Sequence, residues 1–549
     1  MEQSSQSQAI TTRTEALIKR FNKTRSERSV WEQHWEEIAA RVFPSYWHSF
    51  TSRTQNTPGQ KLTQEMFDAT APLALPKFAA AMESMLTPRS QIWHRMVPKE
   101  SSLMRNREVR LYLDDLNDTL FQYRYAPTAN YASQQHEIYM GLGAFGTSCM
   151  FTDANAQGGG LRYRAIHLGE VFFLENHQGV IDTVFRIYRW TVRQAEQKWG
   201  KDALPGQLQT ALEKDPEQEF EFLHIVMPRQ DVPQGGLGPK NMPFASYYCS
   251  ITGHVQLSEG GFRVFPYQVS RYVIAPGEIY GRSPAMLALP TIKVLNEQEK
   301  TVLKQAHRTV DPVLLLHDDG IVDTFSLKPG ALNAGGVTAD GRPLVHALPV
   351  GDLSIVKEMM EQKRAVINDS FLVTLFQILI DTPQMTATEV LERAREKGAL
   401  LSPTMGRQQS EALGPQILRE LDVLFAQGLL PPLPPALIEA GGEFDIEYDS
   451  PLSRAQKAER ASGFMRTMEM GIQHATATGS PEALDWLDID AAIPDIADIN
   501  ATPVAWVRDK QAVMQIRAGR AQNAQVQQAI EASPAVAGAV KALQPGAPK

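Results

Sequence analysis

Three glycines in the segment GLGAFG, at Gly141, Gly143 and Gly146, have the spacing of a dinucleotide-binding loop. Such a loop follows a strand and opens a helix, because the helix N-terminus must face the pyrophosphate. Here a helical pattern, SQQHEIYM, precedes the glycines and a strand-like segment, TSCMF, follows them. The order is inverted, so we interpret these glycines as a helix end and a turn in which a Cβ atom would clash.

Other candidate motifs for chemistry are incomplete. GGLGPKN lacks the GxxxxGK[ST] spacing of a phosphate loop, and HEIYM, which contains His136, lacks the second histidine of a zinc-protease helix. No GxSxG nucleophile motif occurs. The neighbouring acidic pairs Asp114-Asp115 and Asp318-Asp319 are typical of exposed helix and turn residues. The sequence therefore predicts no enzyme, no catalytic or metal site and no cofactor.

The two cysteines, Cys149 and Cys249, lie among apolar and aromatic residues without a CxxC or His-rich neighbour, which predicts buried thiols rather than a disulfide or a metal site. The chain has 549 residues, of which 43% are hydrophobic and 21% charged, as expected for two to four globular domains. A formal net charge of −8 argues against a broad basic face that grips nucleic acid. It does not argue against a surface that nucleic acid slides past.

No apolar run reaches the roughly 18 to 20 residues of a membrane helix, and the first 20 residues lack the apolar stretch of a secretory signal. We therefore expect no membrane anchor and synthesis in the cytoplasm.

The first half of the chain combines helices with an antiparallel α+β region. Trp31, Trp35, Ile38 and Val42 mark one face of an amphipathic helix within residues 8–43. Further helices are predicted from Asp68 and over 103–124 and 128–140, with a strand in QIWHRMVP. Between 145 and 273, short β-branched and aromatic runs separated by turns predict strands, with one helical insert, TVRQAEQKWG.

The second half has a distinctive order of elements. Apolar spacing predicts a helix of about 19 residues that ends at Asp311-Pro312, then short strands and turns, then a longer helix over 352–380. That helix stops at Asp381-Thr382-Pro383, and Thr386-Ala-Thr-Glu389 reads as a capping box that opens another helix, broken near Gly398 and Ser402-Pro403 and resuming to about Gln427. EFDIEYDSPLSR is typical of a strand that returns to a sheet, and the remaining residues are helical.

This order accompanies segments that resemble the head-to-tail connecting (portal) proteins of short-tailed, podovirus-type bacteriophages. The resemblance covers roughly residues 20–450 and is carried by RSVWEQHWEEIAARVFPS, GQKLTQEMFDATAPLALPKFAAAMESMLTPRSQIWHRMVP, EIYGRSPAMLALPTIKVLNEQEKTVLKQAHRTVDPVLLLHDDG and MTATEVLERAREKGALLSPTMGRQQSEALGPQILRELDVLFAQGLLPP. Residues 45–61 and 455–549 match least.

The resemblance implies an α+β portal-type fold with seven regions. They are a mixed α/β wing (1–289), stem helix 1 (290–310), a small β-containing clip (311–350), stem helix 2 (351–376), a tunnel loop (377–385), a long wing helix with the returning strand (386–454), and a helical crown with the C-terminal tail (455–549). The loop at Asp381-Thr382-Pro383 would then interrupt the helix so that a segment can project into a channel.

The resemblance also implies a function and partners. Copies of the chain would form a dodecameric ring at one capsid vertex, through which double-stranded DNA is packaged and ejected without sequence specificity. Expected partners are the terminase large subunit, which supplies the energy, then tail adaptor and tail proteins, and the major capsid and scaffolding proteins. The protein would be made in the cytoplasm of the host bacterium and reside in the virion.

Three sets of residues are the candidates for these contacts. The expected tunnel-loop residues are Gln377, Asp381, Thr382, Pro383 and Gln384. The expected stem residues are Lys293, Glu297, Lys300, Lys304 and Arg308. The expected docking residues of the clip are His317, Asp318, Asp319, Lys328 and Arg342. For any single stem charge, solubility or pairing with a neighbouring subunit is the simpler interpretation.

Two other hypotheses remain. Another ring-forming virion adaptor or tail structural protein would also lack an active site, but the long helix, clip-sized insert and returning helix argue against the smaller adaptors. An enzyme with an unrecognised site is the second, and nucleotide binding distinguishes it, because the portal hypothesis predicts none.

Overall fold

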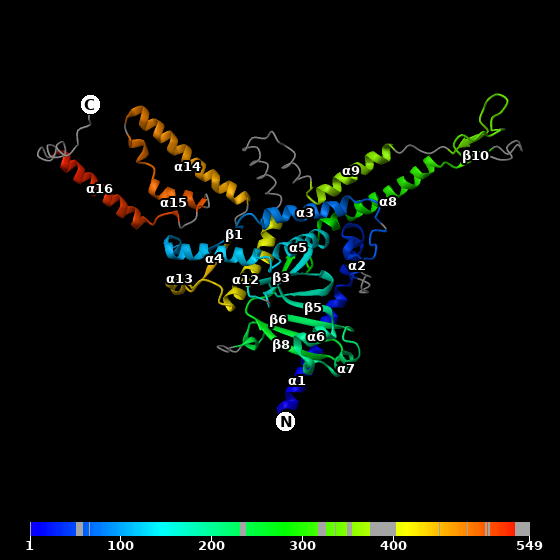
Figure 1. Cartoon of the computed structure of the whole chain (residues 1–549), viewed down its shortest axis with the longest axis horizontal. Coiled ribbons are helices and arrows are strands. Elements are labelled where there is room, and N and C mark those ends of the chain that lie inside the picture. Colours follow the sequence, from blue (N-terminus) through cyan, green and yellow to red (C-terminus); the bar gives the residue numbers. More distant parts are fainter. Residues whose placement is uncertain are drawn as a thin grey trace, which may run out of the picture. The chain divides into compact units, whose positions relative to one another are not determined.

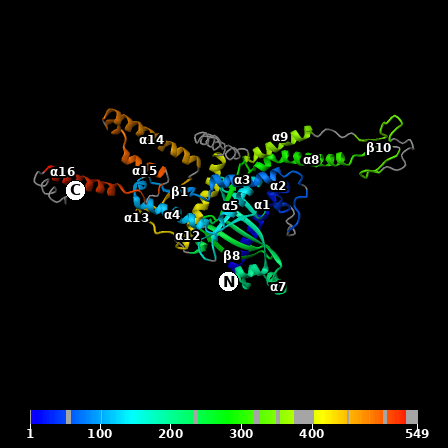
Figure 2. The same ribbon diagram turned by 45° about the horizontal axis from the view of Figure 1, so that its top comes forward.

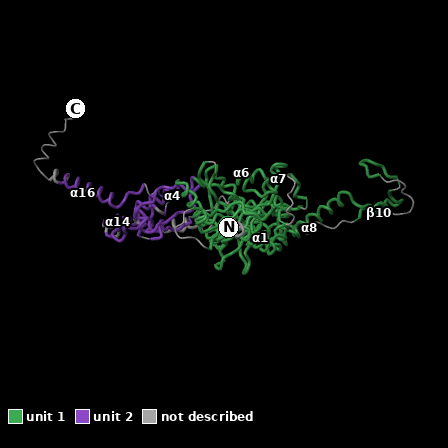
Figure 3. The backbone as a smooth tube through the Cα atoms, turned by 90° about the horizontal axis from the view of Figure 1, so that it is seen from below, with its two compact units in different colours: residues 1–89, 123–428 green, residues 90–122, 429–549 purple. Residues whose placement is uncertain are grey.

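The computed structural model describes residues 2–50, 59–64, 66–100, 102–156, 158–230, 238–316, 326–334, 336–348, 354–373, 402–448, 451–479, 481–499, 502 and 506–532 (Figure 1). The chain divides into two compact units, one formed by residues 1–89 and 123–428 and the other by residues 90–122 and 429–549 (Figure 3). Helices and sheets are mixed, which confirms the α+β class.

The first unit opens with α1 (Glu2–Glu27) and α2 (Ser29–Val42), where the sequence pattern suggested one continuous amphipathic helix. The break falls at Arg28, whose buried guanidinium donates to the carbonyls of Leu168 and Gly169 at 3.0 and 3.1 Å and also to that of Val171. Beyond the break the predicted face is confirmed, because Trp35, Ile38 and Val42 are buried.

Two antiparallel sheets follow, as predicted for residues 145–273. The three-stranded sheet has the order β3-β2-β9 and the five-stranded sheet the order β4-β5-β6-β7-β8. Their strands are β2 (Thr147–Ala154), β3 (Leu161–Ile166), β4 (Val171–Glu175), β5 (Ile181–Thr191), β6 (Glu219–Pro228), β7 (Phe244–Ser250), β8 (Val255–Phe262) and β9 (Tyr267–Arg271).

Helices cover both faces of the five-stranded sheet. Leu17 and Phe21 of α1 pack on one face, against Phe185 and Leu223. On the other face lie α6 (Val192–Trp199), which is the predicted helical insert, and α7 (Gly206–Lys214), which the sequence survey missed. Successive residues of a strand point to opposite faces, so the sheet has a core on each side.

Three more helices complete the body of this unit: α3 (Thr70–Leu86), α5 (Tyr131–Phe145) and α12 (Gly414–Ala426). They agree with the predicted helices from Asp68, over 128–140 and up to Gln427. The helix α4 (Arg107–Tyr125), most of which belongs to the second unit, agrees with the prediction over 103–124.

A two-helix arm also belongs to the first unit. It consists of α8 (Pro284–Val310), the small pair of strands β10 (Leu314–Leu316) and β11 (Val345–Ala347), and α9 (Ser354–Ser370), and both views show α8 and α9 running side by side (Figures 1 and 2). The helix α8 ends at the predicted position but begins before residue 290. Its start is set by Ser283, whose hydroxyl accepts the amide of Met286 at 3.0 Å, so Pro290 lies inside the helix.

The prediction of an uninterrupted helix over 352–380 is wrong at Ser370, where α9 ends. Leu372 has a φ of 59°, a left-handed conformation that ends an α-helix and is disfavoured for a side chain with a Cβ. Phe371 and Val373 on either side are buried, and Phe371 lies edge-on to the ring of Phe78. Burial of these two side chains offsets the backbone strain at Leu372.

In the second unit, β1 (His94–Pro98) pairs antiparallel with β12 (Phe444–Tyr448), which confirms both predicted strands. The short α13 (Pro435–Glu439) precedes β12, and α14 (Pro451–Thr478), α15 (Ile489–Ile499) and α16 (Lys510–Ala532) follow it, as the helical pattern predicted. Among the described helices, none combines the length and apolar character needed to cross a membrane.

Candidate functional site

The glycines that resembled a cofactor loop close the end of α5. Gly146 caps the helix with a φ of 73°, and a Cβ at this position would lie 2.3 Å from the carbonyl oxygen of Gly281. A Cβ at Gly143 would lie 2.7 Å from Cδ1 of Phe78. The interpretation as a helix end and a tight turn is confirmed.

Both thiols are buried and free, as predicted. Desolvation raises the pKa of Cys149 and raises that of Cys249 to about 12, so both are protonated and unreactive at neutral pH. Within the described ranges, no three His, Cys, Asp or Glu side chains come together as a metal site.

The base of the two-helix arm is fixed by one arginine. Arg364 of α9 lies 3.2 Å from Glu299 of α8 and 3.1 Å from Asp68, and it also pairs with Glu361 on its own helix at 2.6 Å. The side-chain oxygen of Asn296 on α8 accepts the amide of Phe67 at 2.7 Å. These contacts hold both helices to the segment before α3.

The predicted stem charges lie along α8, but they differ in their surroundings. Lys293 pairs with Glu37 at 2.7 Å, and Lys300 lies 3.9 Å from Glu297. Lys304 and Arg308 are exposed and have no ion-pair partner within the residues that the structure describes. Of the four predicted stem cations, the two without an ion pair among the described residues therefore lie in the half of α8 nearer the β10–β11 pair.

The same outer part of the arm exposes apolar side chains that the described part of this chain leaves uncovered. Val310 is 87% and Leu332 is 99% exposed. Others in this set are Leu303, Val313, Leu315 and Leu327. Several exposed apolar side chains in one part of a protein suit a protein–protein contact surface.

Comparisons with known proteins bear on what this arm is for. Residues 14–507 match the family model described as bacteriophage head to tail connecting protein. The chain belongs to this family. It is 29% identical to a probable portal protein of Bordetella phage BPP-1 over 94% of this chain and 93% of the relative. It is 26% identical to the portal protein of Salmonella phage epsilon15 over 97% and 95%, respectively.

This head-to-tail connector is a structural component of a phage virion, and its family is not a class of enzymes. The family match confirms the resemblance found in the sequence and its functional class.

The connector's clip candidates are only partly described. Lys328 and Arg342 are exposed, and within the described ranges neither side chain has an ion-pair partner. The backbone around them is ordered by Asn333, whose side-chain oxygen accepts the amide of Ser326 at 2.8 Å, and by Thr338, whose hydroxyl accepts the amide of Arg342 at 3.1 Å. The clip candidates outside the described residues are His317, Asp318 and Asp319. The tunnel-loop candidates Gln377, Asp381, Thr382, Pro383 and Gln384 also lie outside them.

The sequence did not show that three basic residues lie close together. They are Arg164, Arg186 and Lys198, from two segments predicted as strands and one predicted as a helix. All three line one cavity of the first unit. Their signal was the alternation of basic and aromatic residues in RYRAI and RIYRW. Alternation alone indicates an exposed strand face, and only the fold brings these cations together.

Proposed function

We propose that copies of this connector form a dodecameric ring at one capsid vertex, and that its axial channel passes double-stranded DNA during packaging and ejection. The observation that carries the proposal is the two-helix arm with its uncovered apolar side chains. Neighbouring copies around a ring would cover these side chains, which would otherwise remain in water.

The scale of such a ring suits a duplex. Twelve helices spaced by about 10 Å give a circumference of about 120 Å and a diameter of about 38 Å between helix axes. Subtracting one helix radius on each side leaves roughly 28 Å. A B-form duplex and its hydration water fit within this width.

In this proposal the regions are a wing (1–289 and 386–454), stem helices (290–310 and 351–376), a clip (311–350), a tunnel loop (377–385) and a crown (455–549). DNA affinity rises with the number of Lys and Arg contacts to phosphate. The wall of a conduit must not bind the passing DNA tightly, so it should have few free cations. The pairing of Lys293 and Lys300 with glutamates, beside the free Lys304 and Arg308, is consistent with such a lining.

Docking would take place at the clip. The exposed Lys328 and Arg342 suit acidic surfaces of the terminase large subunit and, after packaging, of a tail adaptor. The wing and crown would contact the major capsid and scaffolding proteins. The terminase would supply the energy for packaging, and the chain would be made in the cytoplasm of the host bacterium before it enters the virion.

The experiment that tests this function is phage assembly with altered connectors, measuring the DNA that is protected from nuclease inside the capsid. Truncating residues 377–385 is expected to lower packaging or retention of DNA. The control is Lys201→Gln in the proposed wing, which removes an exposed ion pair with Glu213 and should change neither. If the truncated connector packages and retains DNA normally, the loop has no role in the channel.

A further inference from the structure

A cavity of about 580 Å³ lies in the first unit between the two sheets and α6. This volume is within the roughly 300 to 1,000 Å³ of small-molecule sites. Basic and aromatic side chains line much of it, including Arg164, Arg186, Lys198, Tyr188, Trp190 and Tyr248. The proposed conduit function makes no use of this cavity.

The first cation of the cavity, Arg164, has no ion-pair partner in the described part of the chain. It lies on β3, opposite Phe151 in the strand register, and it is exposed to solvent. Its side chain makes no hydrogen bond or ion pair to another described residue, whereas its backbone belongs to the pairing of β2 with β3. Partial burial lowers the pKa of Arg164, and the positive charge of Arg186 lowers it further.

The second cation, Arg186, is only 7% exposed and incompletely paired. Its Nε donates to Glu170 at 3.1 Å, but its Nη2 is buried without a hydrogen-bond partner in the described structure. The neighbouring Tyr188 is equally buried, and its hydroxyl also lacks a partner there. Buried donors are rarely left unsatisfied in proteins, so an acceptor in the cavity, from water or from a ligand, would satisfy these two groups.

The third cation, Lys198 of α6, contacts rings rather than carboxylates. Its Nζ lies 3.8 Å from the ring centroid of Tyr248 and 5.0 Å from that of Trp190. Desolvation and then the charge of Arg186 lower its pKa to about 8. The ammonium is still largely protonated at neutral pH, and it lacks a carboxylate partner in the described part of the chain.

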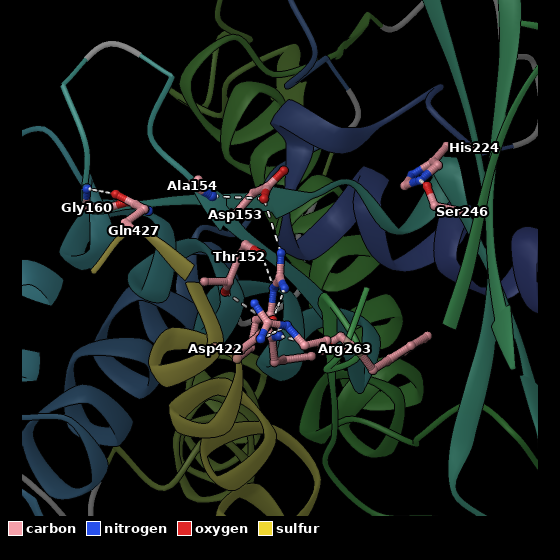
Figure 4. Close-up of polar contacts among 12 residues, drawn as sticks. Thr152, Asp153, Ala154, Gly160, His224, Ser246, Arg263, Asp422 and Gln427 are labelled. Carbon is pink, nitrogen blue, oxygen red and sulfur yellow. Dashed lines mark hydrogen bonds and ion pairs between the residues drawn. The ribbon is translucent and has the colours of Figure 1, made fainter. Parts of the chain in front are cut away.

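The other charged or titratable side chains that line the cavity do not neutralise these cations. Arg162 is itself a cation, and it donates to the carbonyl of Thr128 at 2.8 Å. Asp153 is held at 3.2 Å by Arg419, and the amide of Ala154 donates to it at 2.9 Å (Figure 4). His224 is buried, and its ring nitrogens lie 2.7 Å from the hydroxyl of Tyr267 and 2.9 Å from that of Ser246. Burial lowers the pKa of His224 well below its usual value, so it is neutral.

We propose that this cavity binds a small phosphate-bearing molecule, with the phosphate between Arg164, Arg186 and Lys198 and any organic group against the rings of Trp190 and Tyr248. A phosphate offers several acceptor oxygens and nearly two negative charges, which match three cations and two unsatisfied donors. Duplex DNA suits the site less well, because Arg186, the most buried of the three cations, is only 7% exposed.

Titration calorimetry on the purified full-length chain in phosphate-free buffer tests the proposal. Pyrophosphate is the first probe, and phenyl phosphate compared with inorganic phosphate tests the contribution of the rings. We expect one saturable site per chain. Arg164→Gln and Lys198→Gln should each weaken binding by about tenfold or more, since each removes a charge-assisted contact. The matched control on the same helix is Arg193→Gln, which removes an exposed arginine paired with Glu217 outside the cavity and should leave binding unchanged.

Folding is monitored separately by thermal unfolding without ligand. Arg164→Gln should be as stable as the unaltered chain or more stable, because it removes repulsion from Arg186. Absence of saturable binding by all three probes would overturn the proposal, and so would equal weakening by Arg193→Gln. Competition by a short DNA duplex as strong as that by pyrophosphate would also overturn it, because the cations would then belong to an open nucleic-acid surface.

Discussion

Arg124 and Glu420 form an ion pair that is completely buried, with Nε of the arginine 3.1 and 3.2 Å from the two carboxylate oxygens. The two residues are 296 positions apart in the chain, so the pair joins the end of α4 to α12. Tyr163 and Gln416 donate further hydrogen bonds to the same carboxylate at 2.7 and 2.8 Å. The carboxylate is therefore the shared acceptor of three buried side chains.

Replacing this carboxylate should strongly destabilise the first unit. Glu420→Gln keeps the size of the side chain but leaves the Arg124 guanidinium buried without a counter-charge, which costs about 3–5 kcal/mol. Denaturant unfolding followed by circular dichroism measures the loss. Glu217→Gln is the control, because its pair with Arg193 is exposed and contributes little. Equal stability of the two variants would show that the buried charge is compensated in another way.

Replacing two glycines that have nearly the same φ distinguishes the cost of a steric clash from the cost of a left-handed backbone conformation. Gly146 has a φ of 73° and Gly179 a φ of 76°, but a Cβ at Gly179 would have nothing within 4 Å. Gly179→Ala should cost about 1 kcal/mol from the left-handed backbone alone. Gly146→Ala should cost clearly more, because its Cβ meets the carbonyl of Gly281. Thermal unfolding measures the cost of each replacement. Equal costs would contradict the close approach of the backbone at Gly146 to that at Gly281.

The arm should loosen when Arg364 is removed. Arg364→Met retains much of the side-chain length but breaks the ion pairs to Glu299 and Asp68, so faster amide hydrogen exchange is expected in α9 and in the facing part of α8. Lys363→Met, at the neighbouring position of α9, is the control. Unchanged exchange in Arg364→Met would show that apolar packing alone holds the two helices together.

Stability should fall in mild acid because of His167. Its ring lies between Tyr46 and Phe50, and burial lowers its pKa from about 6.5 to about 4. Between these two values the unfolded chain binds the proton and the folded chain does not, so stability decreases as the pH falls through this window. The contribution of this residue is about 2 kcal/mol between pH 7.5 and pH 5.

The replacement His167→Gln isolates this effect from that of His224, which acts in the same direction. Urea unfolding at the two pH values should show a smaller loss of stability for the variant than for the unaltered chain. An identical loss in both would assign the acid sensitivity to other groups.

Features that depend on neighbouring residues in the chain could be predicted from the sequence. The spacing of Trp35, Ile38 and Val42 predicted a buried helix face, and Asp311-Pro312 predicted the end of α8. The inverted context of Gly143 and Gly146 predicted a turn. In each case the physical cause is local, namely side-chain periodicity, proline geometry or backbone sterics.

Features that depend on residues far apart in the chain could not be predicted from the sequence. The break lies at Arg28, whose side chain donates to carbonyls about 140 positions away, and α9 ends beside Phe371, which is buried against Phe78. The cationic cavity likewise combines β3, β5 and α6. Among the candidate stem residues, the fold shows that Lys293 and Lys300 are paired and that Lys304 and Arg308 have no ion pair with a described residue. The spacing of these residues in the sequence did not show this difference.

The central claim is that this connector works as a ring around DNA, and the most direct test is imaging of the purified chain by negative-stain electron microscopy together with mass photometry. Rings of about twelve subunits with a central hole are expected, because neighbouring copies would cover the exposed apolar side chains of the arm. A chain that remains a monomer or dimer at micromolar concentration, also in the presence of its scaffolding protein, would contradict this claim.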